Sequence, residues 1–166
     1  MDNMLKDCKT YYGAIDIGSN AVRLLIKCVE EDEQGKVFFS KVLLLRVPLR
    51  LGFDVFAMGK ISETKEKNML RLMKVFHHLM KIYDVEDYRA CATSAMRDAK
   101  NGKDIIKRIK KKTGIRIEII DGQEEAKMIY NNHIECMEDR NGNYMYVDVG
   151  GGSTEINLLS QGELVF

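Results

Sequence analysis

The sequence predicts an α/β protein built from layers of strands and helices. Segments rich in β-branched, aromatic and aliphatic residues fill the first third of the chain, and helical patterns then alternate with short apolar segments. A strand–corner–strand pattern occurs twice, once near each end, which indicates an internal repeat. The composition, with 45% hydrophobic and 31% charged residues, is that of an ordinary globular protein.

Three strands are expected first, over residues 11–18, 21–30 and 36–47. A charged turn over 30–35 separates the last two strands. Pro48, the only proline, ends the third strand, because proline has no N–H to donate to a neighbouring strand.

The segment 63–83 is expected to form a helix that Ser62 caps. Its apolar side chains recur at i, i+3 and i+4 and therefore form a single stripe, typical of a helix packed on a core. The stripe consists of Met69, Leu72, Met73, Phe76, Leu79, Met80 and Tyr83.

Two short apolar segments, 88–94 and 115–120, are expected to be strands. Between them lies a basic helix over 102–112, which Asn101 caps and Gly114 ends.

Asp121 and Glu124 have the spacing of a capping box, in which the Glu124 side chain reaches back to the Asp121 N–H. The box begins a helix that runs to about Met137. Strands over 143–150 and 153–160, joined by three glycines, complete the sequence.

The repeated pattern covers residues 14–26 and 146–159. Each copy has an apolar strand ending in an aspartate, one apolar residue, a glycine corner with a serine, and a second apolar strand. Asp16 and Asp148 are the equivalent aspartates.

The repeat divides the chain into two expected domains. The first occupies 1–121, and the second begins at 122 and is represented only by its linking helix and opening hairpin, 122–166. We therefore expect a partial chain with one complete domain.

Both glycine corners suit phosphate, because a turn without Cβ atoms aims backbone N–H groups at an anion that can approach closely. A single glycine-rich turn is more often a flexible hairpin, but two matching Asp-x-Gly corners favour phosphate binding. The aspartates Asp16 and Asp148 are candidate ligands of a hard divalent cation. The candidate phosphate-binding residues are Gly18, Ser19, Asn20, Gly150, Gly151, Gly152, Ser153 and Thr154.

Four segments in order carry a resemblance to a known family: "AIDIGSN", "ATSAMRDAKNG", "IEIIDGQEEAKMIY" and "VDVGGGSTEI". Together they resemble the exopolyphosphatase/guanosine pentaphosphate phosphohydrolase (Ppx/GppA) family of the actin-like ATPase superfamily. The resemblance implies an RNase H-like domain with a five-stranded mixed sheet and flanking helices, followed by the start of a second similar domain.

The resemblance also implies roles for single residues. Asp148 and Glu155 match acidic positions associated with metal and with handling of the attacking water, and Arg97 matches a basic residue at the phosphate-binding cleft. Glu125 matches the general base, and the implied cofactor is Mg²⁺ or another divalent cation. The position of Glu125 agrees, because it lies about 100° further round the helix than Glu124. Both glutamates alternatively serve only to complement the helix N-terminus.

The expected function is hydrolysis of terminal orthophosphate from inorganic polyphosphate or a guanosine polyphosphate. The 166-residue portion alone is expected to be weak or inactive. The alternative is a non-catalytic phosphate-ligand sensor or assembly domain, and a sugar kinase or actin-type ATPase is a third possibility on the same fold. Polyphosphate and guanosine pentaphosphate are not separated by this part of the sequence.

The remaining features restrict partners and location. A formal net charge of +1 gives no global field that would attract nucleic acid or a membrane. There is no secretory signal, the longest aliphatic run is only "VLLL", and the four cysteines form no C-x-x-C pair. We expect a cytoplasmic protein with reduced thiols, and the oligomeric state stays open between a monomer and a homodimer.

Overall fold

The computed structural model describes residues 9–165 except 33, 136–141, 153 and 162. Within these residues, no helix is long and apolar enough to cross a membrane.

The first layer is a five-stranded sheet with the order β3-β2-β1-β4-β5. β2 is antiparallel to both of its neighbours, β1 and β3, whereas β4 and β5 run parallel to β1, so the sheet is mixed as expected. The strands are β1 Thr10–Ile17, β2 Val22–Glu31, β3 Val37–Val47, β4 Val85–Ala92 and β5 Glu118–Ile119.

The fifth strand is shorter than the predicted 115–120. Only residues 118 and 119 pair with β4. The Arg116 N–H donates instead to the Tyr88 hydroxyl at 3.0 Å, so this backbone group is satisfied by a side chain outside the sheet ladder.

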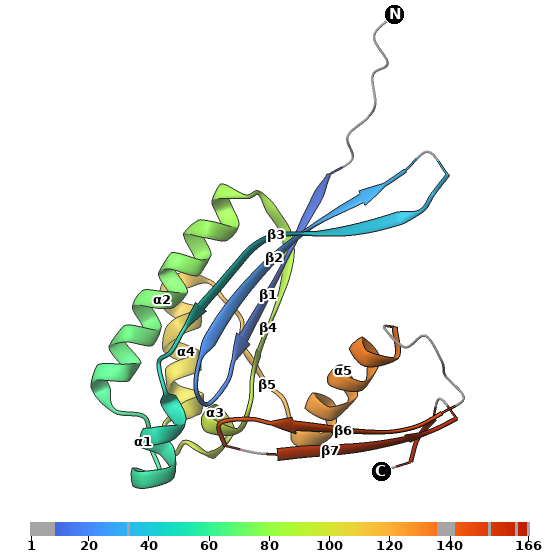
Figure 1. Cartoon of the computed structure of the whole chain (residues 1–166). Helices are drawn as coiled ribbons and strands as arrows, with labels where there is room; N and C mark the ends of the chain where they lie inside the picture. The colour runs from blue at the N-terminus through green and yellow to red at the C-terminus, as the bar shows by residue number, and fades with distance from the viewer. Residues whose placement is uncertain (1–8, 33, 136–141, 153, 162, 166) are drawn as a thin grey trace, which may run out of the picture.

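Four helices accompany the sheet: α1 Leu51–Met58, α2 Glu63–Ile82, α3 Ser94–Asp98 and α4 Gly102–Thr113. α2 and α4 cover one face of the sheet (Figure 1). The predicted α2 is confirmed, with the Ser62 side chain accepting from the Lys65 N–H. α1 and α3 were not predicted from the sequence.

The start of α4 differs from the prediction in the hydrogen bonds that its N-cap residue makes. Asn101 occupies the N-cap position but makes no cap hydrogen bond. Its amide instead accepts from the Ile61 N–H at 3.0 Å and donates to the Ile61 carbonyl at 2.8 Å. This pair of bonds ties α4 to the loop ahead of α2. Gly114 ends the helix in the left-handed conformation, as predicted.

The core lies between the sheet and these helices. Alternate residues of β1 and β2 point to α2 and α4, since side chains of a strand alternate between its faces. The most deeply buried side chains from the two layers are Ile17, Leu24, Ile26, Met69, Met73, Phe76, Ile105 and Ile109. Met69, Met73 and Phe76 belong to the stripe that the helical periodicity of 63–83 predicted.

The chain then forms α5 Gly122–Glu135 and a three-stranded antiparallel sheet of β6 Asn143–Val149, β7 Thr154–Ser160 and β8 Glu163–Leu164. α5 packs against β7. These elements lie on the side of the first sheet opposite α2 and α4, near the end at which β1 and β4 finish (Figure 1). The two predicted strands are confirmed, whereas β8 was not predicted, and the expected helix end at Met137 lies outside the described residues.

The predicted fold class is therefore confirmed: an α/β domain of the RNase H-like type with a mixed five-stranded sheet and flanking helices.

Candidate active site

The first glycine corner connects β1 to β2 at the carboxyl end of β1. It is closed by a hydrogen bond from the Gly18 N–H to the Ala21 carbonyl at 3.1 Å. The Ser19 hydroxyl, which is buried, lies 2.7 Å from the buried hydroxyl of Ser94 on α3. The corner is thus held by the segment that follows the neighbouring parallel strand.

α1 holds the same corner from the other side. The Gly52 N–H donates to the Ser19 carbonyl and the Arg50 N–H donates to the Asn20 carbonyl, each at 2.8 Å. Arg50 has φ 52°, a left-handed conformation that turns the chain into the helix. A Cβ on Gly52 would lie 3.0 Å from the Ser19 Cβ, so glycine permits this close approach.

The second glycine corner, between β6 and β7, packs directly against the first. A Cβ on Gly151 would lie 3.2 Å from the Asn20 Cβ and 3.3 Å from the Asn20 N. A Cβ on Gly152 would overlap the Phe56 ring and lie 2.8 Å from the Ser19 Oγ. The bare backbone is therefore required by the proximity of the two corners.

A cavity of about 590 Å³ lies where the corners meet. Seven residues predicted from the sequence line it: Asp16, Gly18, Ser19, Asn20, Glu125, Gly150 and Gly151. Others were not anticipated, among them Arg23, Arg89, Cys91, Thr93 and Ser94. Arg23 and Arg89 are arginines within segments predicted as strands, and this is the sequence signal that could have indicated them.

Asp16 is already paired in this conformation. Its residue partner across the β1–β2 ladder is Arg23, and the Arg23 guanidinium donates to the Asp16 carboxylate. The ion pair engages Oδ2, so a metal-binding role for Asp16 would use its other carboxylate oxygen or compete with Arg23.

The start of α5 determines where its two glutamates point. The Asp121 carboxylate accepts from the Glu124 N–H at 2.8 Å, which is half of the predicted capping box. The other half is not formed, because the Glu124 side chain pairs with Arg89 at 2.6 Å instead of reaching back. Glu125 lines the cavity, and its Oε2 atom is buried.

Arg89 is held by two carboxylates. Its Nη2 lies 2.6 Å from Glu124 Oε1 and 3.1 Å from Glu118 Oε2. Hydrogen bonds to Glu124 and Glu118 raise the pKa of the Arg89 guanidinium above its ordinary value, so it stays fully charged.

Arg97, predicted to contact phosphate, lies on α3 and is not among the cavity-lining residues. Its Nη1 donates to the Ile120 carbonyl at 2.8 Å. In this conformation Arg97 fastens the connection between β5 and α5. Thr154 begins β7 and is exposed.

Three predicted residues are described incompletely. Ser153 lies outside the described residues, and the side chains of Asp148 and Glu155 do as well. The backbones of Asp148 and Glu155 are directly paired across β6 and β7. Their positions share the face that carries the inward pair Tyr146 and Asn157 and packs against α5.

The placement of these acidic residues decides whether the site could bind a divalent cation. No group of three possible metal-ligating side chains occurs among the residues whose side chains the structure describes. Positions 148 and 155 nevertheless lie on the α5 side of the second sheet, and α5 carries Glu125. Carboxylate oxygens are the ligands that Mg²⁺ prefers. The residue types at these positions therefore fit such an ion.

Cys91 lines the cavity but is a poor nucleophile. Burial raises the pKa of the Cys91 thiol, nearby Arg89 opposes this, and the carboxylates of Glu118, Glu124 and Asp16 add to the rise. The thiol therefore stays protonated at neutral pH, whereas the thiolate is the reactive form.

A family model described as the Ppx/GppA phosphatase family matches residues 28–166. The chain belongs to this family. The membership predicted from the sequence is confirmed. The cavity lies at the two glycine corners, which belong to the segments that resemble the family.

Individual Ppx/GppA relatives agree. The chain is 33% identical over 148 residues to a bifunctional 3-dehydroquinate synthase/phosphatase of Fusobacterium nucleatum, a match that covers 87% of this chain and 22% of the relative. It is 28% identical over 145 residues to exopolyphosphatase 1 of Mycobacterium tuberculosis, covering 87% of this chain and 41% of the relative.

Solved structures of the family match as well. A Ppx/GppA family member of Aquifex aeolicus has a TM-score of 0.78 at 29% identity, over 94% of this chain and 49% of that one. An exopolyphosphatase of Cytophaga hutchinsonii has a TM-score of 0.84 at 27% identity, over 95% and 49%. The chain spans less than half the length of each of these four relatives.

Proposed function

We propose that the protein is a hydrolase that releases terminal orthophosphate from inorganic polyphosphate or from guanosine pentaphosphate. The observation that carries the proposal is that both glycine corners and Glu125, which are far apart in the sequence, line one cavity. Exopolyphosphatases among the relatives support the same class of substrate. We further propose that the protein acts in the cytoplasm.

The glycine corners would hold the terminal phosphates. Residues 18–20 and 150–151 line the cavity, and the backbone N–H groups of 19, 20, 150 and 151 would donate to phosphate oxygens, since the Gly18 N–H already donates to the Ala21 carbonyl. Because these donors are fixed before the substrate arrives, they would stabilise the charge that develops as the terminal bond breaks.

Glu125 would act as the general base. It would take a proton from a water molecule whose oxygen attacks the terminal phosphorus, while the bond from that phosphorus to the bridging oxygen breaks and the shortened chain leaves. A carboxylate that lines the cavity is placed to take part in this proton transfer. The protonated Cys91 thiol is consistent with direct attack by water rather than a covalent intermediate.

A divalent cation such as Mg²⁺ would be held by Asp148 and Glu155, and it would supply positive charge to neutralise the phosphate oxygens. Asp16 would join them from the opposite corner through Oδ1, the carboxylate oxygen that its ion pair with Arg23 does not use.

The test is release of orthophosphate by the full-length protein from long polyphosphate and, in parallel, from guanosine pentaphosphate. Glu125→Gln keeps the shape of the side chain and removes its basicity, and it should lower kcat by about 10²–10⁴-fold. Glu63→Gln, on the exposed first turn of α2 and remote from the cavity, is the matched control and should leave kcat unchanged.

Near-wild-type release by Glu125→Gln on both substrates would show that Glu125 is not the base. Tight binding of polyphosphate by the wild-type protein, with no release in Mg²⁺, would instead identify the non-catalytic binding protein. The ratio of kcat/KM for the two substrates decides which of them is preferred.

A further inference from the structure

Arg89 connects the first sheet to the start of α5. It projects from β4 and contacts Glu118 on the neighbouring strand β5 through both Nε and Nη2, at 3.3 and 3.1 Å. The same Nη2 contacts Glu124 in the first turn of α5 at 2.6 Å. One planar guanidinium therefore joins two parallel strands and a helix.

The contact with Glu124 restricts the direction of Glu125. Consecutive helical residues project about 100° apart, so fixing one side chain fixes the sector available to the next. Asp121 already holds the Glu124 N–H at 2.8 Å. With Arg89 holding the side chain as well, rotation of the first turn of α5 about its axis is disfavoured, and Glu125, the next residue, lines the cavity.

Arg89 also lines the cavity, so direct contact with a phosphate is the competing explanation. The charge of the cluster around Arg89 argues against direct contact with a phosphate. Two carboxylates face one guanidinium, which leaves the cluster of Arg89, Glu118 and Glu124 with a net negative charge that repels a phosphate group. The Nε and Nη2 groups of Arg89 moreover already donate to Glu118 and Glu124.

We propose that Arg89 is a positioning residue of the phosphatase reaction, which acts by holding Glu124 and thereby directing Glu125 at the attacking water. This inference rests on the proposed role of Glu125 as the base.

The position of the cluster makes the proposal testable without loss of the fold. The side chains of Arg89, Glu118 and Glu124 are 51%, 59% and 45% exposed, and ion pairs this exposed contribute little to stability. Removing Arg89 should therefore leave the thermal midpoint nearly unchanged. The rate should respond nevertheless, because the same contact energy sets the fraction of molecules in which the general base points at the attacking water.

The experiment measures steady-state phosphate release from long polyphosphate by the full-length protein. Arg89→Ala should lower kcat by about three- to fivefold, the loss that an exposed ion pair can produce, while KM stays unchanged, because the base and not the binding site is disturbed. Glu124→Ala should give the same loss, and Arg89→Ala/Glu124→Ala should be no worse than either single variant, since both act through one contact. The kcat of Arg89→Lys should lie between those of the wild type and Arg89→Ala, because a lysine cannot bridge two carboxylates as a guanidinium does.

Arg108→Ala is the matched control. It removes an arginine of similar exposure that pairs with Glu66 at 2.7 Å on the far side of the molecule, and kcat should stay within twofold of wild type. The proposal is overturned if Arg89→Ala raises KM at unchanged kcat, which would make Arg89 a substrate contact. It is also overturned if Arg89→Ala keeps its kcat while Glu125→Gln loses it, an outcome that leaves the proposed function standing. Absence of release by the wild-type protein would overturn both.

Discussion

Gly151 and Gly152 show what three adjacent glycines do in this chain. None of them has a positive φ, so an unusual backbone conformation is not the reason for glycine. The reason is contact: at both positions a Cβ would enter space that Asn20, Ser19 or Phe56 already occupies. At these positions glycine therefore permits two loops from distant parts of the sequence to touch.

Gly152→Ala should therefore separate the corners. The Phe56 ring is half-exposed and can move, but the Ser19 hydroxyl is buried against Ser94 and cannot. An overpacking penalty of about 1–3 kcal/mol, expressed as lost affinity, corresponds to a roughly 5–150-fold weaker binding of polyphosphate, measured by calorimetry.

Gly122→Ala is the control for this substitution, because an added Cβ there meets nothing within 4 Å. It should bind polyphosphate as the wild type does. Equal affinity of Gly152→Ala and wild type would mean that the corners need not touch for binding.

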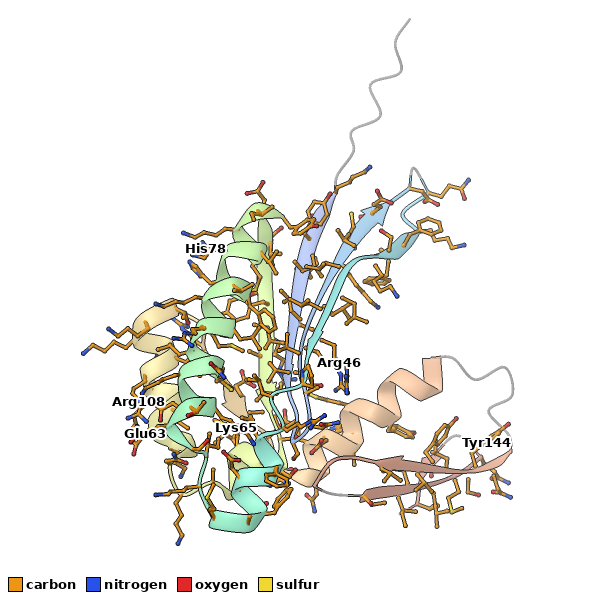
Figure 2. All side chains as sticks on the ribbon, turned by 60° about the vertical axis from the view of Figure 1, so that its left-hand side comes forward. Arg46, Glu63, Lys65, His78, Arg108 and Tyr144 are labelled. Carbon is orange, nitrogen blue, oxygen red and sulfur yellow. The ribbon has the colours of Figure 1, made fainter. Side chains whose placement is uncertain are left out.

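Among the elements, α1 fixes the first glycine corner, because backbone N–H groups at its start donate to the carbonyls of Ser19 and Asn20. α1 is in turn fixed to α2 by Asp54, which is 6% exposed. Asp54 accepts from Lys65 Nζ at 2.6 Å and from the Ser62 N–H at 3.0 Å. Figure 2 shows Lys65 at the junction of the two helices.

This junction predicts an acid-sensitive contribution to stability. Burial raises the pKa of the Asp54 carboxyl, but the hydrogen bonds to Lys65 and Ser62 and the Lys65 charge outweigh it, so the pKa is lowered in the folded protein. A carboxyl of this kind stabilises the fold above its unfolded pKa, near 3.8, and the contribution disappears as the pH falls through the lower folded value.

Asp54→Asn should therefore lower the free energy of unfolding by about 1–3 kcal/mol at pH 7. The difference from wild type should shrink as the pH falls below about 4, the ordinary pKa of an aspartate. Urea unfolding at several pH values measures both effects. Asp104→Asn, an exposed aspartate on α4, should change neither. A difference that stays constant down to pH 2 would show that the Asp54 charge is not responsible.

The same elements show how far the sequence could be interpreted. β1 to β3, α2 and α4 follow periodic patterns within their own segments, and these patterns predict them. α1 follows a left-handed residue, Arg50, and is fastened by bonds to a distant corner, so no local pattern marks it. In the site, the glycine corners and Glu125 lie in motifs. Arg89 was missed because its partners are 29 and 35 residues further along the chain.

At the scale of the whole molecule, the two parts are stabilised very unequally. The main hydrophobic core extends from Ile15 to Ile117 and belongs entirely to the first sheet and its helices. Among the described residues after 121, Leu159 is the only fully buried apolar side chain. The outer face of the second sheet exposes Met145, Val147, Val149 and Ile156. Because stability follows buried apolar area, the second sheet should open without unfolding the first.

Native-state hydrogen exchange on the chain tests this inequality. The amides of β1, β2 and β4 should exchange only by global unfolding, and those of β6 and β7 at least tenfold faster through local opening. Phe76→Ala, which leaves a cavity in the main core at a cost of about 3–5 kcal/mol, should accelerate exchange in the first sheet. Leu159→Ala should accelerate exchange in β6 and β7 alone. Equal protection of β1 and β7, or acceleration of both sheets by Leu159→Ala, would show that the chain unfolds as one cooperative unit. The two glycine corners would then separate only when the whole fold unfolds.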